Sequence, residues 1–130
     1  MAPGSLDTLG ALQRSVLEVL WELGEGTVAD VRSGLGRRRQ PAYTTVLSVM
    51  QKLEKAGWLG HREAGRAYVY FPTCSRDEAG RGSLRGLVDR VFGGDPLAAF
   101  QHLLDDRRIT AEDLAELGAV IAKKRKERKQ

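Results

Sequence analysis

The stretch PAYTTVLSVMQKLEKAG, residues 41–57, decides the fold predicted for this chain. Pro41 suits a helix start, and Gly57 suits the position just after a helix end. Between them, apolar side chains recur with the period of an α-helix, at Val46, Val49, Met50 and Leu53. The stretch therefore predicts a helix with one apolar side.

The opposite side of this helix is polar. It carries hydroxyls, an amide and cations, from Thr44, Thr45, Ser48, Gln51, Lys52 and Lys55. Such side chains hydrogen-bond base edges and phosphates in protein–DNA complexes. An ordinary solvated helix face has a similar composition, so this helix alone leaves both interpretations open.

The neighbouring segments complete a larger pattern. A broad apolar stripe predicts a first helix from Leu9 to Gly24, and the capping pair Thr27 and Asp30 begins a second. After Gly57 the residues alternate as in strands over 58–63 and 66–71, with a glycine in the turn. The order helix, helix, helix, hairpin predicts a winged helix-turn-helix over residues 8–73. The third helix would then enter the major groove of DNA.

Arginines flank the predicted DNA-binding helix. Arg37, Arg38 and Arg39 precede it, and Arg62 and Arg66 lie near the hairpin tip. These arginines either are solvated or contact phosphates. Residues 1–72 hold nine Lys/Arg against seven Asp/Glu, whereas residues 73–122 hold six against nine. Binding to a polyanion is therefore predicted for the first part of the chain and not for residues 73–122.

Residues 74–122 are predicted to be helical and different in kind. Helices are expected to begin at Ser75, Asp95 and Thr110, with a break at Gly93-Gly94. They carry exposed apolar positions at Leu84, Leu87, Val88, Val91, Phe92, Phe100, Leu103, Leu114, Leu117 and Ile121. These residues pack either on the first helix or on a second copy, and large apolar patches favour the second copy. Two copies related by a two-fold axis would read a palindrome. The overall prediction is a mainly α fold with a small β-hairpin, a helical dimerisation region at 74–122, and a basic, disordered tail at 123–130.

Several other functions are not indicated. The single cysteine, Cys74, cannot form an internal disulfide, which fits a reducing cytosol. It is interpreted as a small, partly buried residue, with reactivity or metal binding as the alternative. His61 and His102 lie far apart, so no metal site is predicted, nor is a cofactor, a small-molecule ligand or a catalytic arrangement. We expect no signal peptide and no membrane span.

Four motifs occur in an order and spacing that resemble one known family. They are VLEVLWELGEGTVADV at 16–31, AYTTVLSVMQKLEKAGWL at 42–59, GRAYVYFP at 65–72 and LVDRVFGGDP at 87–96. They resemble, in turn, the first helix with its turn, the recognition helix, the second wing strand and the dimerisation helix of the BlaI/MecI family. This family comprises the penicillinase and methicillin-resistance repressors.

The resemblance implies a cytoplasmic, homodimeric transcriptional repressor that binds an operator in double-stranded DNA. It places DNA contacts at Thr44, Thr45, Ser48 and Lys52, with Arg62 and Arg66 in the wing. Many members are cut by a membrane sensor-protease that responds to β-lactam antibiotics. The comparable bond here is His102-Leu103, where staphylococcal members have Asn-Phe. A copper-responsive branch has C-terminal cysteine ligands, which this chain lacks.

One alternative function stays open. Some winged helices bind other proteins without reading DNA, and such a module needs no basic recognition face.

Overall fold

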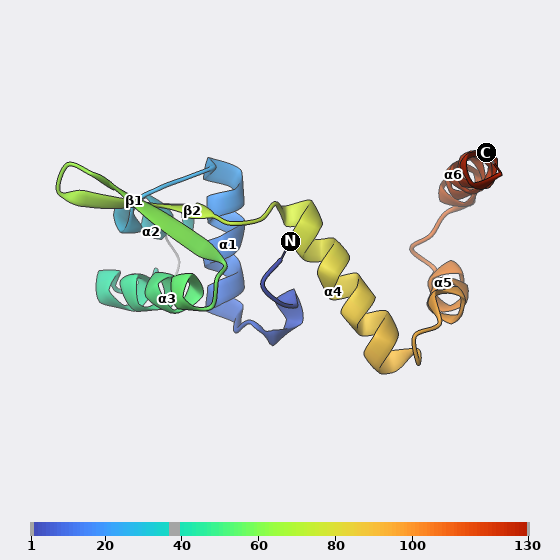
Figure 1. The fold of residues 1–130 in the computed structure, drawn as a ribbon, viewed down its shortest axis with the longest axis horizontal. Helices are drawn as coiled ribbons and strands as arrows, with labels where there is room; N and C mark the ends of the chain where they lie inside the picture. The colour runs from blue at the N-terminus through green and yellow to red at the C-terminus, as the bar shows by residue number, and fades with distance from the viewer. Residues whose placement is uncertain (1, 37–39, 130) are drawn as a thin grey trace. The chain divides into compact units, whose positions relative to one another are not determined.

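The computed structural model describes residues 2–36 and 40–129 (Figure 1). It divides into two compact units, Met1–Gly86 and Leu87–Gln130. The boundary predicted from the sequence lies between residues 73 and 74, at the end of the hairpin. The first unit extends into the next helix because Ala79 is buried in its core and Ser83 accepts a hydrogen bond from the Leu6 amide, at 2.8 Å.

The first unit contains three helices and a hairpin. After a short 3-10 turn at Leu6–Thr8 come α1 (Ala11–Leu23), α2 (Val28–Gly34), α3 (Tyr43–Lys55), β1 (Leu59–Ala64) and β2 (Ala67–Pro72). The strands are antiparallel, in a register that runs from Leu59 opposite Pro72 to Ala64 opposite Ala67. This is the predicted order of elements. Helix α3 starts at Tyr43, after Ala42 as its N-cap, so Pro41 lies just outside the helix instead of in its first turn.

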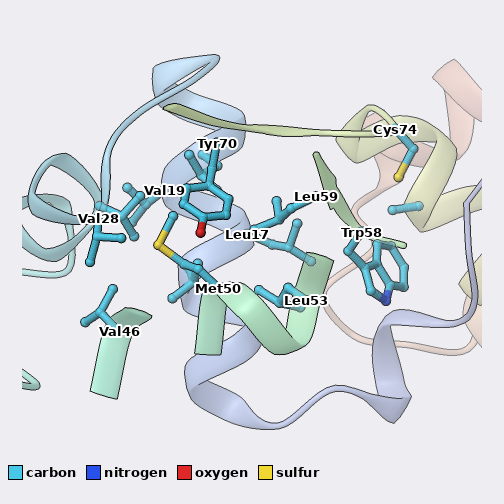
Figure 2. Packing of buried hydrophobic residues seen from close by; sticks show 14 residues of the cluster. Leu17, Val19, Val28, Val46, Met50, Leu53, Trp58, Leu59, Tyr70 and Cys74 are labelled. Carbon is cyan, nitrogen blue, oxygen red and sulfur yellow. The ribbon is translucent and has the colours of Figure 1, made fainter. Parts of the chain in front are cut away.

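The core of this unit lies where α1, α2, α3 and the hairpin meet. Figure 2 shows their buried side chains pointing toward one another around Leu17, Met50 and Tyr70. The side chains of Val16, Leu17, Leu20, Val31, Val46, Met50 and Leu53 are completely buried. The apolar stripe of α3 thus packs on α1 and the hairpin, and its polar side is left on the surface.

Three further helices follow: α4 (Arg76–Val91), α5 (Pro96–Leu104) and α6 (Ala111–Arg128). Their predicted starts are confirmed. The Glu78 amide donates to the Ser75 hydroxyl at 3.1 Å, the Leu97 amide to Asp95 at 3.0 Å, and the Asp113 amide to Thr110 at 3.0 Å. Gly93 and Gly94 have φ of 59° and 79° and end α4 as expected.

The residues that follow Ala122 differ from the prediction of a disordered tail. Helix α6 continues through them to Arg128. Lysine and arginine have high intrinsic helix propensity, so this basic segment can extend the helix that precedes it. Across the described residues, no helix combines the length and the apolar character that a membrane span requires.

Candidate nucleic-acid interface

Helix α3 separates its two sides as the sequence predicted. Val46, Met50 and Leu53 are buried without exposed area. The polar residues predicted to contact DNA are all exposed: Thr44, Thr45, Ser48, Gln51 and Lys52. Lys55 is exposed on the same helix, and so is Tyr43 in its first turn, a residue that the sequence analysis did not single out. The exposed side is therefore a row of hydroxyls followed by an amide and cations.

Two hydrogen bonds join Arg32 of α2 to the residues just before α3. The Arg32 Nε donates to the carbonyl oxygen of Pro41 at 2.7 Å. The Gln40 Nε2 donates in return to the carbonyl oxygen of Arg32 at 2.6 Å. Together they fix the angle at which the chain enters α3. Periodicity gave no sign of these contacts, because they join side chains to backbone eight and nine residues away.

The predicted contacts Arg37, Arg38 and Arg39 lie outside the described residues. Their role stays a prediction from the sequence.

The hairpin is tied to the turn between α1 and α2. The Gly26 amide donates to the Tyr70 carbonyl at 2.9 Å, and the Tyr70 amide donates to the Gly26 carbonyl at 2.8 Å. This isolated bridge adds a third, one-residue strand beside β2. Helix α2 begins just after it, with Thr27 and Asp30 capping each other as predicted. The Thr27 amide, and then its hydroxyl, holds the pKa of Asp30 below its ordinary value.

The hairpin wing presents its two arginines differently. Arg66 lies in the turn after Gly65, whose φ is +65°, and the described residues offer it no ion pair. Arg62 lies in β1 and forms an ion pair with Glu25, in the turn that leads to the bridge. Arg66 is therefore open to a phosphate, whereas Arg62 would have to leave a carboxylate first.

A second carboxylate lies between α3 and the wing. Glu54, in the last turn of α3, pairs with the imidazole of His61 in β1. The His61 ring lies 4.6 Å from the Tyr68 ring and 5.6 Å from the Tyr70 ring, measured between centroids. These contacts join the end of α3 to the wing. Sequence patterns do not reveal the Glu54–His61 and Glu25–Arg62 pairs, because both depend on the folded arrangement.

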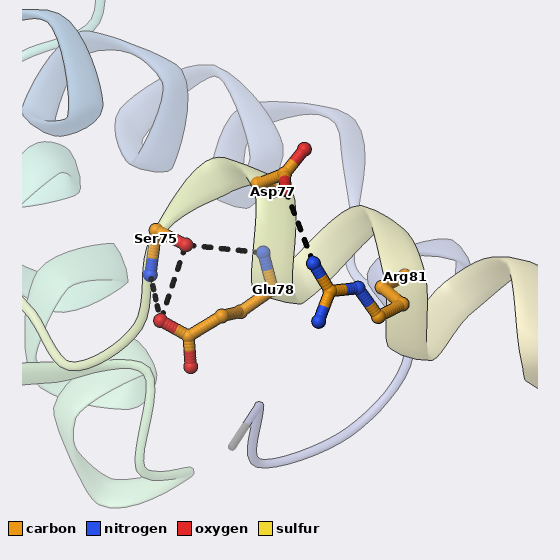
Figure 3. A network of polar contacts seen from close by, with 4 residues as sticks. All are labelled: Ser75, Asp77, Glu78 and Arg81. Carbon is orange, nitrogen blue, oxygen red and sulfur yellow. Dashed lines mark hydrogen bonds and ion pairs between the residues drawn. The ribbon is translucent and has the colours of Figure 1, made fainter. Parts of the chain in front are cut away.

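Cys74 has a structural place at the start of α4. It is buried, and burial, followed by the charge of Glu78, raises the pKa of its thiol. Its carbonyl oxygen accepts a hydrogen bond from the Trp21 indole at 2.9 Å. The helix that follows is capped by Ser75 and Glu78, next to an ion pair of Asp77 and Arg81 (Figure 3). Cys74 is therefore a packed core residue, more deeply buried than the partly buried position that the sequence predicted.

Three packed helices, the third with a polar exposed side, and a wing hydrogen-bonded to the α1–α2 turn define a winged helix-turn-helix protein. The family model described as penicillinase repressor matches residues 9–123, and the chain belongs to this family of transcriptional regulators.

The chain is similar to individual curated proteins and solved structures. The transcriptional regulator BlaI of Mycobacterium tuberculosis is 34% identical over 119 residues, which are 90% of this chain and 85% of that protein. The penicillinase repressor of Bacillus licheniformis is 20% identical over 115 residues, 88% of this chain and 90% of that protein. Among solved structures, the DNA-binding domain of the repressor BlaI aligns with a TM-score of 0.49 at 21% identity. The alignment covers 58% of this chain and 92% of that domain.

Proposed function

We propose that this protein is a homodimeric, sequence-specific repressor that occupies a palindromic operator and so blocks a promoter. The observation that carries the proposal is the exposed polar side of α3, on a winged helix of the penicillinase repressor family. An α-helix fits the major groove, where hydroxyls and amides can reach base edges.

The side chains of α3 divide into two roles. Thr44, Thr45 and Ser48 are short, so they read base edges or thymine methyl groups. A good base contact of this kind discriminates between bases by about 1–3 kcal/mol. Lys52 is long and contacts a phosphate, with Gln51 beside it. Arg66 supplies a phosphate contact from the wing, and Arg62 does so after releasing Glu25.

The dimer part of the proposal is supported by apolar side chains that the described structure leaves exposed. On α4 these are Leu84, Leu87 and Val91, and Val91 is 63% exposed. On α5 and α6 they include Phe100, Leu103, Leu114 and Ile121. Three other predicted contacts are half-buried: Val88 on α4, Phe92 just after it, and Leu117 on α6. Apolar surface of this extent in one chain marks an interaction site. A second copy would cover it and would place two recognition helices on two half-sites.

Release by a membrane sensor-protease is the second part of the proposal. The bond between His102 and Leu103 lies in the last turn of α5, and both side chains are exposed. Proteases favour exposed loop tips, so this turn must open before the bond can be cut. Cleavage there would separate α6 from the rest of the dimerisation region.

The DNA-binding proposal can be tested with two charge reversals of equal size. Lys52→Glu changes α3, and Arg14→Glu makes the same change at an exposed position of α1. The probes are duplexes from the promoters of the chain's own and neighbouring genes, with a scrambled duplex of equal length as the reference. We expect wild type and Arg14→Glu to prefer one promoter duplex. Lys52→Glu should bind that duplex at least about tenfold more weakly, the equivalent of about 1.4 kcal/mol.

A folded wild-type protein that shows no preference for any promoter duplex at about 50 mM salt would overturn the proposal. It would favour the alternative, a winged helix that binds protein. Equal effects of Lys52→Glu and Arg14→Glu would instead overturn the docking of α3.

A further inference from the structure

The last two turns of α6 carry the densest positive charge in the chain. Residues 123–130 hold six Lys/Arg against one Glu, and residues 1–72 hold nine against seven. Each described side chain of this segment is exposed. The six cations are Lys123, Lys124, Arg125, Lys126, Arg128 and Lys129. We call residues 123–129 the basic segment.

The cations of the basic segment surround the helix. The apolar positions Leu114, Leu117 and Ile121 follow one side of α6 and stop at Ile121. With about 100° of rotation per residue, Lys124 and Arg128 fall on that same side, and Lys126 falls opposite. The basic segment therefore has no apolar side of its own with which to pack on protein. Its partner must neutralise charge.

The described part of the chain neutralises little of this charge. Lys124 lies 3.5 Å from Glu127, the one acidic side chain in the segment. Like charges three or four residues apart, such as Arg125 and Lys129, disfavour the helix. The helix dipole favours cations in the last turn, but it does not account for those a turn earlier. A polyanion would relieve this repulsion.

The described part of the surface formed by α3 and the wing has few cations available for phosphates. Among its described residues, Arg62 is paired with Glu25. The cations that remain available to bind phosphates are Lys52, Lys55 and Arg66. Proteins whose DNA affinity depends strongly on salt bind about six to ten phosphates. Counting only the described residues of this surface, the basic segment holds twice as many cations as are left without a carboxylate partner. Arg37, Arg38 and Arg39 lie outside the described residues.

We infer that the basic segment is a second contact with duplex DNA, made to phosphates and independent of sequence. This inference rests on the proposed function, because α3 and the wing bring the duplex to the protein. The segment adds affinity and salt dependence, while α3 adds discrimination between sequences.

The test is a variant in which all six cations of the segment are replaced by glutamine. Glutamine has a helix propensity close to that of lysine and arginine, so the helix is retained, which circular dichroism can verify. The matched control replaces the four lysines by arginine and keeps the charge. Affinities are measured for the preferred promoter duplex and for the scrambled duplex, between about 50 and 200 mM salt.

We expect the glutamine variant to bind both duplexes more weakly by the same factor. The slope of log affinity against log salt should become shallower by about 0.9 for each phosphate that the segment no longer neutralises. The preference for the promoter duplex should not change, and the arginine control should behave as wild type.

An unchanged slope and affinity in the glutamine variant would overturn the inference. It would also be overturned if the segment is needed for binding to phosphatidylserine vesicles but not to DNA. The proposed function fails in a different way: wild type would not distinguish the promoter from the scrambled duplex, whatever the glutamine variant does.

Discussion

At Arg62 the fold places a carboxylate against a predicted phosphate contact. Arg62 lies directly opposite Val69 in the hairpin, and its guanidinium reaches Glu25 across β2. Val69 is largely buried although it does not belong to the core cluster. Glu25 therefore has two effects: it orients the arginine, and it competes with phosphate for it.

Glu25→Gln should tighten DNA binding. Exposed ion pairs contribute about 0–1 kcal/mol, so removal of this competitor should lower the dissociation constant by up to about fivefold. A freed Arg62 should also steepen the salt dependence, by about 0.9 in slope for each new phosphate contact. The measurement is fluorescence anisotropy with the preferred promoter duplex over a range of salt concentrations.

Glu22→Gln is the matched control, because Glu22 is an exposed acid on α1, three residues away. It removes the same net charge without touching Arg62. Equal effects of the two variants would show that net charge alone matters. Weaker binding by Glu25→Gln would show that orienting Arg62 is the larger effect.

At the scale of elements, α1 and α2 are in tight contact at Gly34. A Cβ atom at this position would lie 2.5 Å from the Val19 Cγ1, closer than two carbon atoms can pack. Val19 is buried and β-branched, so it has little freedom to move away. Gly80, inside α4, has open space around it instead.

Gly34→Ala should lower the free energy of unfolding by about 1–3 kcal/mol, the usual cost of overpacking. Gly80→Ala should raise it by about 0.5–1 kcal/mol, because alanine favours a helix interior and meets nothing here. Urea unfolding measures both. A double-mutant cycle with Val19→Ala adds a check. Gly34→Ala should lower the free energy of unfolding by less once the Val19 side chain is truncated. A neutral Gly34→Ala with no coupling to Val19 would contradict this packing.

The elements also show which parts of the fold the sequence could predict. The caps Thr27–Asp30, Ser75–Glu78 and Thr110–Asp113 are local, so a spacing of three residues was sufficient to find them. The exposed side of α3 followed from periodicity for the same reason. The Gly26–Tyr70 bridge and the ion pair of Glu25 with Arg62 could not be predicted, because their residues lie far apart in the sequence. The extension of α6 differs from the predicted disordered tail because the helix propensity of lysine and arginine outweighs their mutual repulsion.

At the scale of the whole molecule, exposed leucine, valine and phenylalanine on α4 to α6 predict self-association. Leu87 and Val91 are one helical turn apart on α4, and both are exposed. We expect Leu87→Asp combined with Val91→Asp to give a monomer, because paired aspartates in an apolar interface would be buried without partners. Binding to the promoter duplex should weaken by about 10²-fold or more, because the two DNA-binding units are no longer linked. Bivalent binding usually raises affinity by about 10²–10⁴.

Sedimentation velocity checks the mass, and Asp89→Arg is the control, because it changes charge on another side of the same helix. A dimer that survives the double substitution would place the interface elsewhere.

Both tryptophans of the chain, Trp21 and Trp58, belong to the unit that carries the wing. Trp58 is 3% exposed, and the Trp21 indole is anchored to the carbonyl of Cys74. Intrinsic tryptophan fluorescence consequently reports melting of the unit that carries the wing, whereas far-ultraviolet dichroism averages over all six α-helices described. If the two signals separate on heating, the halves lose their structure independently, and a single unfolding temperature does not describe the molecule.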